Sequence, residues 1–151
     1  MSLKETLDQL AFYAKGMRVL YVEDENQIRE NTQLLLSKIF SDVQTATNGN
    51  QGLALYQSSS FDLVITDILM PEMNGVAMIR KIKELTPSQP FIVTSACEES
   101  NYLVDLINLG VAQFLIKPMK TDQIIKILNE VVQNIYNGRI RDGRKVKEFK
   151  D

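Results

Sequence analysis

Five short apolar runs recur along the chain, and each is followed by a segment with apolar residues at helical spacing. The runs cover residues 18–22, 42–46, 63–66, 91–94 and 113–116. Short β-branched runs are typical of buried strands, and apolar positions three or four residues apart are typical of amphipathic helices. Five strand–helix units in a row predict a parallel sheet with helices on both faces. The run 42–46 is the most polar, so we expect it at a sheet edge.

The predicted helices are marked by apolar residues at helical spacing: Ile28, Leu35, Ile39, Val76, Ile79, Ile82, Leu103, Leu106, Ile107, Ile124, Leu128, Val131 and Ile135. After a turn at Asn48-Gly49, we expect a short helix over 52–56. The helix around Leu106 should stop at Gly110. The last helix should run from an N-cap at Thr121 to Asn137-Gly138.

Two flanks lie outside this alternation, which divides the chain into 1–16, 17–137 and 138–151. Apolar spacing predicts an extra helix over residues 3–15, which either packs on its own domain or contacts a second copy or partner. The tail 138–151 holds six Lys or Arg and three acids. Such a charge run is typical of a solvated linker, and nucleic-acid binding is the less favoured interpretation.

Composition excludes several classes of chemistry. The chain has no histidine, which removes Ser-His-Asp catalysis and His-ligated zinc. Its single cysteine allows no internal disulfide framework, which favours a reducing, cytoplasmic location. A net charge of −2 does not favour binding to nucleic acid or a membrane surface. No apolar stretch approaches the ~20 residues of a membrane helix.

Acids follow two of the predicted strands. Asp67 closes the run 63–66, and Glu23 and Asp24 follow the first strand. Because ligands of open α/β sheets bind outside the carboxyl ends of the strands, we expect these acids to converge. Crowded carboxylates are unfavourable without a cation, so they predict a Mg²⁺ site that would also accept Mn²⁺. Glu23 and Asp24 alone could equally start the next helix.

Ser95 and Lys117 end the fourth and fifth predicted strands. Alone, such a serine is usually a cap and such a lysine a solvated charge. With Asp67, however, they supply a carboxylate, a hydroxyl donor and a cation at the same end of the sheet. Such a set can hold an aspartyl phosphate beside Mg²⁺.

Four motifs carry a resemblance to a known family: Val22-Glu23-Asp24-Glu25, Asp67 with Met70-Pro71 and Gly75, Ser95-Ala96, and Lys117-Pro118. Together they resemble the receiver domain of bacterial two-component response regulators, over residues 17–137. The resemblance implies a flavodoxin-like (βα)5 doubly wound sheet with strand order 2-1-3-4-5. It also implies a signalling switch, not an enzyme, in which a sensor histidine kinase phosphorylates Asp67 in a Mg²⁺-dependent reaction.

The resemblance also implies individual roles. Asp67 would be the phosphoacceptor, with Asp24 and the backbone carbonyl of Leu69 contacting the metal directly and Glu23 contacting it through water. Ser95 and Lys117 would hold the phosphoryl group, and Phe114 would occupy the switch position. A cis peptide is expected between Lys117 and Pro118. The face that changes would comprise the helix 103–107, the strand 113–116 and the last helix, a candidate surface for homodimers. An output domain beyond the C-terminus is a further candidate partner.

Departures and rivals qualify this interpretation. Phe114 has no hydroxyl, so a switch there acts by packing alone. Leu69 and Cys97 flank the phosphoryl position and cannot readily orient water, which predicts slow self-dephosphorylation. A haloacid-dehalogenase-like phosphatase needs an acid where Leu69 stands, and a flavodoxin-like cofactor protein needs a phosphate loop where 23–25 are acidic. The alternative left open is an interaction module that acts without phosphorylation.

Overall fold

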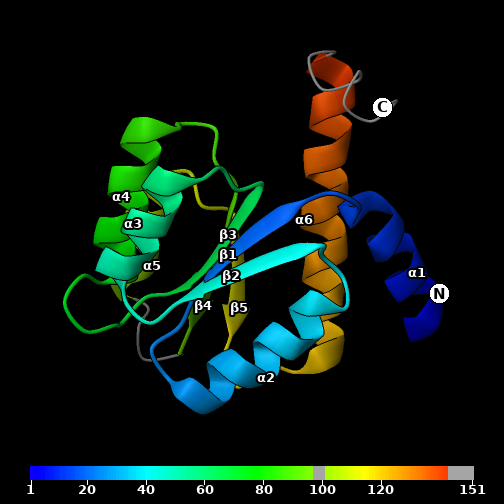
Figure 1. Cartoon of the computed structure of the whole chain (residues 1–151), viewed down its shortest axis with the longest axis horizontal. Coiled ribbons are helices and arrows are strands. Elements are labelled where there is room, and N and C mark those ends of the chain that lie inside the picture. The colour runs from blue at the N-terminus through cyan, green and yellow to red at the C-terminus, as the bar shows by residue number, and fades with distance from the viewer. Residues whose placement is uncertain (97–100, 143–151) are drawn as a thin grey trace.

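A five-stranded parallel sheet forms the centre of the molecule in the computed structural model, which describes residues 1–96 and 101–142 (Figure 1). Its strands are β1 (Arg18–Val22), β2 (Asp42–Ala46), β3 (Leu63–Asp67), β4 (Phe91–Ser95) and β5 (Gln113–Ile116). Every neighbouring pair is parallel, in the order β2-β1-β3-β4-β5. The predicted flavodoxin-like fold is therefore confirmed, as is the edge position of the polar strand β2.

Helices cover both faces of the sheet. They are α1 (Leu3–Ala14), α2 (Asn26–Ser37), α3 (Gly49–Ser58), α4 (Gly75–Leu85), α5 (Leu103–Asn108) and α6 (Thr121–Asp142). Figure 1 shows α3, α4 and α5 on one side, with α1, α2 and α6 on the other. Each face of the sheet has its own apolar core. Strand β1 contributes side chains to both cores because successive side chains point to opposite faces. Strands β3 and β4 are buried at every position, as expected for central parallel strands.

Helix α3 begins earlier than the sequence predicts. Asn48 is not part of a free turn: its side chain accepts a hydrogen bond from the Gln51 N–H and caps the helix. Gly49 is the first helical residue, and its N–H donates to the Met73 carbonyl oxygen at 3.1 Å. A Cβ at Gly49 would lie 2.2 Å from that oxygen. The glycine thus serves close backbone contact rather than a turn.

The predicted end of the last helix is wrong. Helix α6 continues through Asn137 and Gly138 to Asp142, so the first part of the expected linker is helical. Packing explains this, because Tyr136 still contacts the core and Arg139 forms an ion pair with Asp62. The helix also begins at Thr121 itself rather than after it. Residues 143–151 lie outside the described part of the chain.

The predicted apolar face of helix α5 is only partly correct. Leu106 is fully buried, as expected, but Ile107 is 60% exposed. The helix has only six residues, so it presents one turn and a half to the core. Gly110, with φ of 92°, follows it and allows the chain to turn into β5.

The predicted N-terminal helix exists and packs on its own domain. Leu10 and Ala14 of α1 are fully buried against the core that α6 shares. Tyr13 contacts Tyr136 edge to face at a centroid distance of 5.0 Å, and Gln9 accepts a hydrogen bond from Asn129. This contact within the domain accounts for Leu7, Leu10 and Ala14 of the apolar stripe, whereas Leu3 remains exposed.

Candidate functional site

Three carboxylates converge at the carboxyl edge of the sheet. Each of Glu23, Asp24 and Asp67 offers one oxygen, and these oxygens lie within 4.8 Å of one another. Strands β1 and β3 are hydrogen-bonded neighbours in register, which brings the end of one beside the end of the other. Glu23 is fully buried and Asp67 is 4% exposed, whereas Asp24 is exposed. The structure therefore brings together the three acids that the sequence placed at this edge.

Lys117 joins the acids from the neighbouring edge of the sheet. Its Nζ atom lies 2.8 Å from Asp67 Oδ2 and 3.4 Å from Glu23 Oε1. The residue follows β5 directly, and its backbone N–H donates to the Ser95 carbonyl oxygen. The Lys117–Pro118 peptide is cis, as expected. Asp67 and Lys117 are thus in direct contact although 50 residues separate them.

Burial sets the charge balance of this cluster. The pKa of Glu23 is raised to about 7, first because the carboxyl is buried and then because Asp67 lies close to it. Burial alone would lower the pKa of Lys117, but Asp67 and Glu23 outweigh it and raise that pKa. Lys117 therefore remains a cation. Among the described residues, its ammonium group is the positive charge that pairs with the Glu23 and Asp67 carboxyls.

The donor set fits a small divalent cation. Glu23 Oε1 is buried and, within the described part of the chain, accepts no hydrogen bond although it forms an ion pair with Lys117. Carboxylate oxygens are the ligands that Mg²⁺ and Mn²⁺ prefer. A cation here would satisfy this oxygen and reduce the repulsion between three acids.

The segment between β3 and α4 fixes the backbone around Asp67. The Ile68 N–H donates to Asp67 Oδ1 at 2.9 Å, and the Gly75 N–H donates to the Ile68 carbonyl oxygen at 2.7 Å. A Cβ at Gly75 would lie 2.2 Å from the Asp67 carbonyl oxygen, so only glycine lets α4 start this close to the acid. Asn74 caps α4 by accepting from the Ala77 N–H. Leu69 in this loop is 47% exposed, and metal binding by its carbonyl oxygen stays a prediction.

Two further predicted site residues, Ser95 and Phe114, make other interactions in this structure. Ser95 is the last residue of β4 and is 1% exposed, and its hydroxyl donates to the Ala96 carbonyl oxygen at 3.0 Å. Phe114 on β5 is partly buried against the core beneath α3, α4 and α5. Among the described residues, the Ser95 hydroxyl forms its hydrogen bond with Ala96 and not with Asp67, and Cys97 lies outside this part of the chain.

Sequence reasoning missed one residue of this region, Arg29. One guanidinium nitrogen, Nη1, donates to the Glu23 carbonyl oxygen at 2.9 Å, and Nη2 donates to the Asn26 side chain. The sequence does contain one signal for this role: a cation near the start of the helix that follows the acidic loop 23–25.

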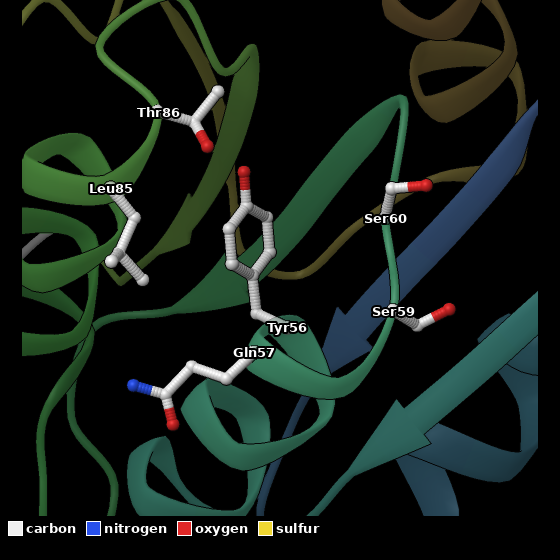
Figure 2. Close-up of a pocket in the computed structure, with 6 residues that line it drawn as sticks. All are labelled: Tyr56, Gln57, Ser59, Ser60, Leu85 and Thr86. Atoms are coloured by element: carbon white, nitrogen blue, oxygen red, sulfur yellow. The ribbon is translucent and has the colours of Figure 1, made fainter.

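A separate hollow of about 280 Å³ lies at the opposite end of the strands (Figure 2). It is lined by Tyr56, Gln57, Ser59, Ser60, Leu85 and Thr86. The Tyr56 hydroxyl donates to Gln89 Oε1 at 2.6 Å and so already has its partner. This hollow contains none of the predicted site residues.

A search of the described residues for membrane spans finds no helix with the length and apolar character that crossing a bilayer requires.

Known proteins resemble the chain in both sequence and structure. The chain is 33% identical to the chemotaxis protein CheY of Thermotoga maritima over 77% of its own length and 98% of that protein. It is 32% identical to CheY of Bacillus subtilis, over 76% of this chain and 97% of that protein. The N-terminal domain of an uncharacterised Wolinella succinogenes protein superposes with a TM-score of 0.76 at 32% identity, over 82% of this chain and 99% of that one. Residues 19–129 match the response regulator receiver domain family. Acid cluster, strand order and sequence agree, and the chain belongs to the family of response regulator receiver domains.

Proposed function

We propose that this receiver domain is a switch in which Asp67 accepts a phosphoryl group from a sensor histidine kinase, in a reaction that needs Mg²⁺ or Mn²⁺. The observation that carries the proposal is the 2.8 Å contact between Lys117 Nζ and Asp67 Oδ2, inside a cluster of three acids. Receiver domains are signalling domains, so no turnover of an external substrate is proposed.

The chain's own residues divide the work of the transfer. An Asp67 oxygen forms the new bond to phosphorus while the bond from phosphorus to the donor nitrogen breaks. The Ile68 N–H holds Oδ1 and so fixes the rotation of the carboxylate. Lys117 already lies beside Oδ2 and would pair with an oxygen of the incoming group. Glu23, Asp24, Asp67 and the Leu69 carbonyl would hold Mg²⁺, which offsets negative charge when bound.

The readout begins with Ser95. Its hydroxyl donates to a backbone carbonyl oxygen in this structure, so a rotation about one bond would redirect it to a phosphoryl oxygen. Phe114, which packs without a hydroxyl, would then shift against its core. A complete switch from one state to the other needs about 5.5 kcal/mol of differential stabilisation.

The surface that would report this change comprises α5, β5 and α6. The apolar residues Val104 and Ile107 of α5 and Ile116 of β5 are 64%, 60% and 45% exposed. Exposed apolar groups gathered on adjacent elements favour a contact surface. We propose it as the surface for a second copy or for an output partner.

Incubation with Mg²⁺ and acetyl phosphate, followed by intact mass measurement, tests the function. We expect a gain of one phosphoryl group that requires the divalent cation. An unmodified protein at saturating Mg²⁺ would instead favour the second candidate, an interaction module that acts without phosphorylation.

A further inference from the structure

The loop that carries Glu23 and Asp24 is held at three backbone or side-chain points. The Glu23 N–H donates to the Ala46 carbonyl oxygen at 3.0 Å, and the Glu25 N–H donates to Glu23 Oε2 at 3.2 Å. The third point is the Glu23 carbonyl oxygen, which accepts from Arg29 Nη1 at 2.9 Å. This last bond joins the loop to helix α2, because Arg29 lies one turn inside that helix.

Anchoring this carbonyl oxygen also fixes the residue that follows it. The peptide group is planar, so the orientation of the Glu23 carbonyl determines where the Asp24 backbone and Cα lie. Asp24 is exposed, so packing does not hold its side chain in place. The bond from Arg29 therefore limits the directions in which the Asp24 carboxylate can point.

Arginine suits this position better than another cation. Its planar guanidinium donates to the Glu23 carbonyl oxygen and to the Asn26 side chain at once, which bridges the loop and the first turn of α2. Its charge also lies beside a loop of three successive acids, 23–25. A lysine would keep the charge but could not span both acceptors with a rigid fork.

We propose that Arg29 is a positioning residue that holds the Glu23–Asp24 peptide in the orientation required to bind Mg²⁺. The inference rests on the proposed function, because it assigns the metal to the acids of this loop. It concerns affinity for the cation and does not place Arg29 in contact with the phosphoryl group.

Titration calorimetry with Mg²⁺ alone tests the inference on wild type, Arg29→Met and Arg29→Lys. We expect Arg29→Met to weaken Mg²⁺ binding about tenfold, as removal of a group that orients a metal ligand does. Arg29→Lys should recover only part of the affinity, because it restores the charge without the two-point contact. Arg80→Met, which removes an exposed cation of α4, is the matched control and should bind Mg²⁺ as wild type does.

Two results would overturn the inference: wild-type affinity in Arg29→Met, or complete recovery in Arg29→Lys, which would reduce the role to charge. If Arg29→Met does not fold, as judged by circular dichroism, Arg29→Lys decides alone, and wild-type affinity in it overturns the inference.

A second readout is the rate of phosphorylation by acetyl phosphate. The rate of Arg29→Met should fall below that of wild type, and the difference should shrink as Mg²⁺ approaches saturation. A deficit that persists unchanged at saturation would contradict a role in metal binding. Failure of wild type to gain a phosphoryl group would refute the proposed function. The Mg²⁺ affinities of wild type and the Arg29 variants would still test the role of Arg29.

Discussion

The two ends of the central sheet treat charge in opposite ways. At the amino ends of the strands, Arg18 Nε lies 2.6 Å from Asp42 Oδ2, and Arg139 forms an ion pair with Asp62. Asp62 also accepts the backbone N–H of Arg18, so each acid there has its own cation or donor. At the carboxyl ends, three acids lie together and Lys117 pairs with two of them, while a buried oxygen of Glu23 accepts no hydrogen bond among the described residues.

We infer that this difference separates charges that complete the fold from charges that would bind a ligand. Paired charges at the amino ends complete their interactions within the fold and need no ligand. The excess of acid at the carboxyl ends is unfavourable unless a proton or a cation compensates it. The same residue types therefore form complete ion pairs at one end of the molecule and would favour cation binding at the other.

The sharpest test of this contrast exchanges one acid at each end of β3. We expect Asp67→Asn to abolish phosphorylation by acetyl phosphate, because the amide cannot act as the nucleophile. Asp62→Asn, the matched change at the other end of the same strand, should still gain one phosphoryl group. Intact mass measurement reads both outcomes, and modification of Asp67→Asn would mean that another residue is the acceptor.

The next effect concerns the cation of the acid cluster. Lys117→Met should slow phosphorylation about 100-fold, because a charged group that stabilises the transferring oxygens is lost. In Mg²⁺-free buffer, we expect the unfolding free energy to fall by about 3 kcal/mol, since two buried carboxyls lose their partner.

Lys81→Met removes an exposed lysine of α4 and serves as the control in both measurements. Urea unfolding gives the stability change, and initial rates give the kinetic one. Equal behaviour of the two lysine variants would show that Lys117 is an ordinary surface charge.

A smaller effect is the pH dependence of stability without metal. The pKa of Glu23 rises from 4.5 to about 7 on folding, so the folded state holds a proton that the unfolded state releases. This contribution is fully present below pH 4.5 and is lost as pH rises toward 7. Urea unfolding between these values should show the decline in wild type but not in Glu23→Gln.

Asp42→Asn changes an acid at the other end of the sheet and should retain the wild-type decline. If the decline persists in Glu23→Gln, it arises elsewhere in the molecule.

The smallest effect is expected at the amino ends. Arg139→Met removes a partly exposed ion pair and should cost about 1 kcal/mol or less of unfolding free energy. Phosphorylation by acetyl phosphate should not change, because the pair completes its interactions away from the acid cluster. A clear loss of phosphorylation without a loss of stability would instead connect this pair to the site.

The sheet and the convergence of the acids could be predicted because strand-end positions follow directly from the alternation of runs. The edge position of β2 followed from its polar residues in the same way. Local signals were ambiguous at helix ends, where Asn48-Gly49 fits a turn and an N-cap equally well. The continuation of α6 depends on tertiary contacts of Tyr136 and Arg139 that no local pattern contains.

Within the site, sequence order identified which side chains meet but not how they are oriented. Ser95 was expected to face the phosphoryl position, whereas its hydroxyl bonds to a neighbouring carbonyl oxygen in this structure. Arg29 was missed because its role depends on the reach of a long side chain back to the loop before its own helix. Both are matters of rotamer and distance, which spacing along the chain does not determine.

The unbroken length of α6 has a mechanical consequence. With 22 residues its axis is about 33 Å long, roughly twice the length of a five-residue strand. Helix α6 begins shortly after Lys117. Near its other end, Arg139 forms an ion pair with Asp62, the residue directly before β3. A tilt of about 5° around its start would move the far end by about 3 Å over such a length. A rigid helix of this length would therefore turn a small tilt beside the acid cluster into a larger displacement at its C-terminal end, provided that the Arg139–Asp62 pair opens.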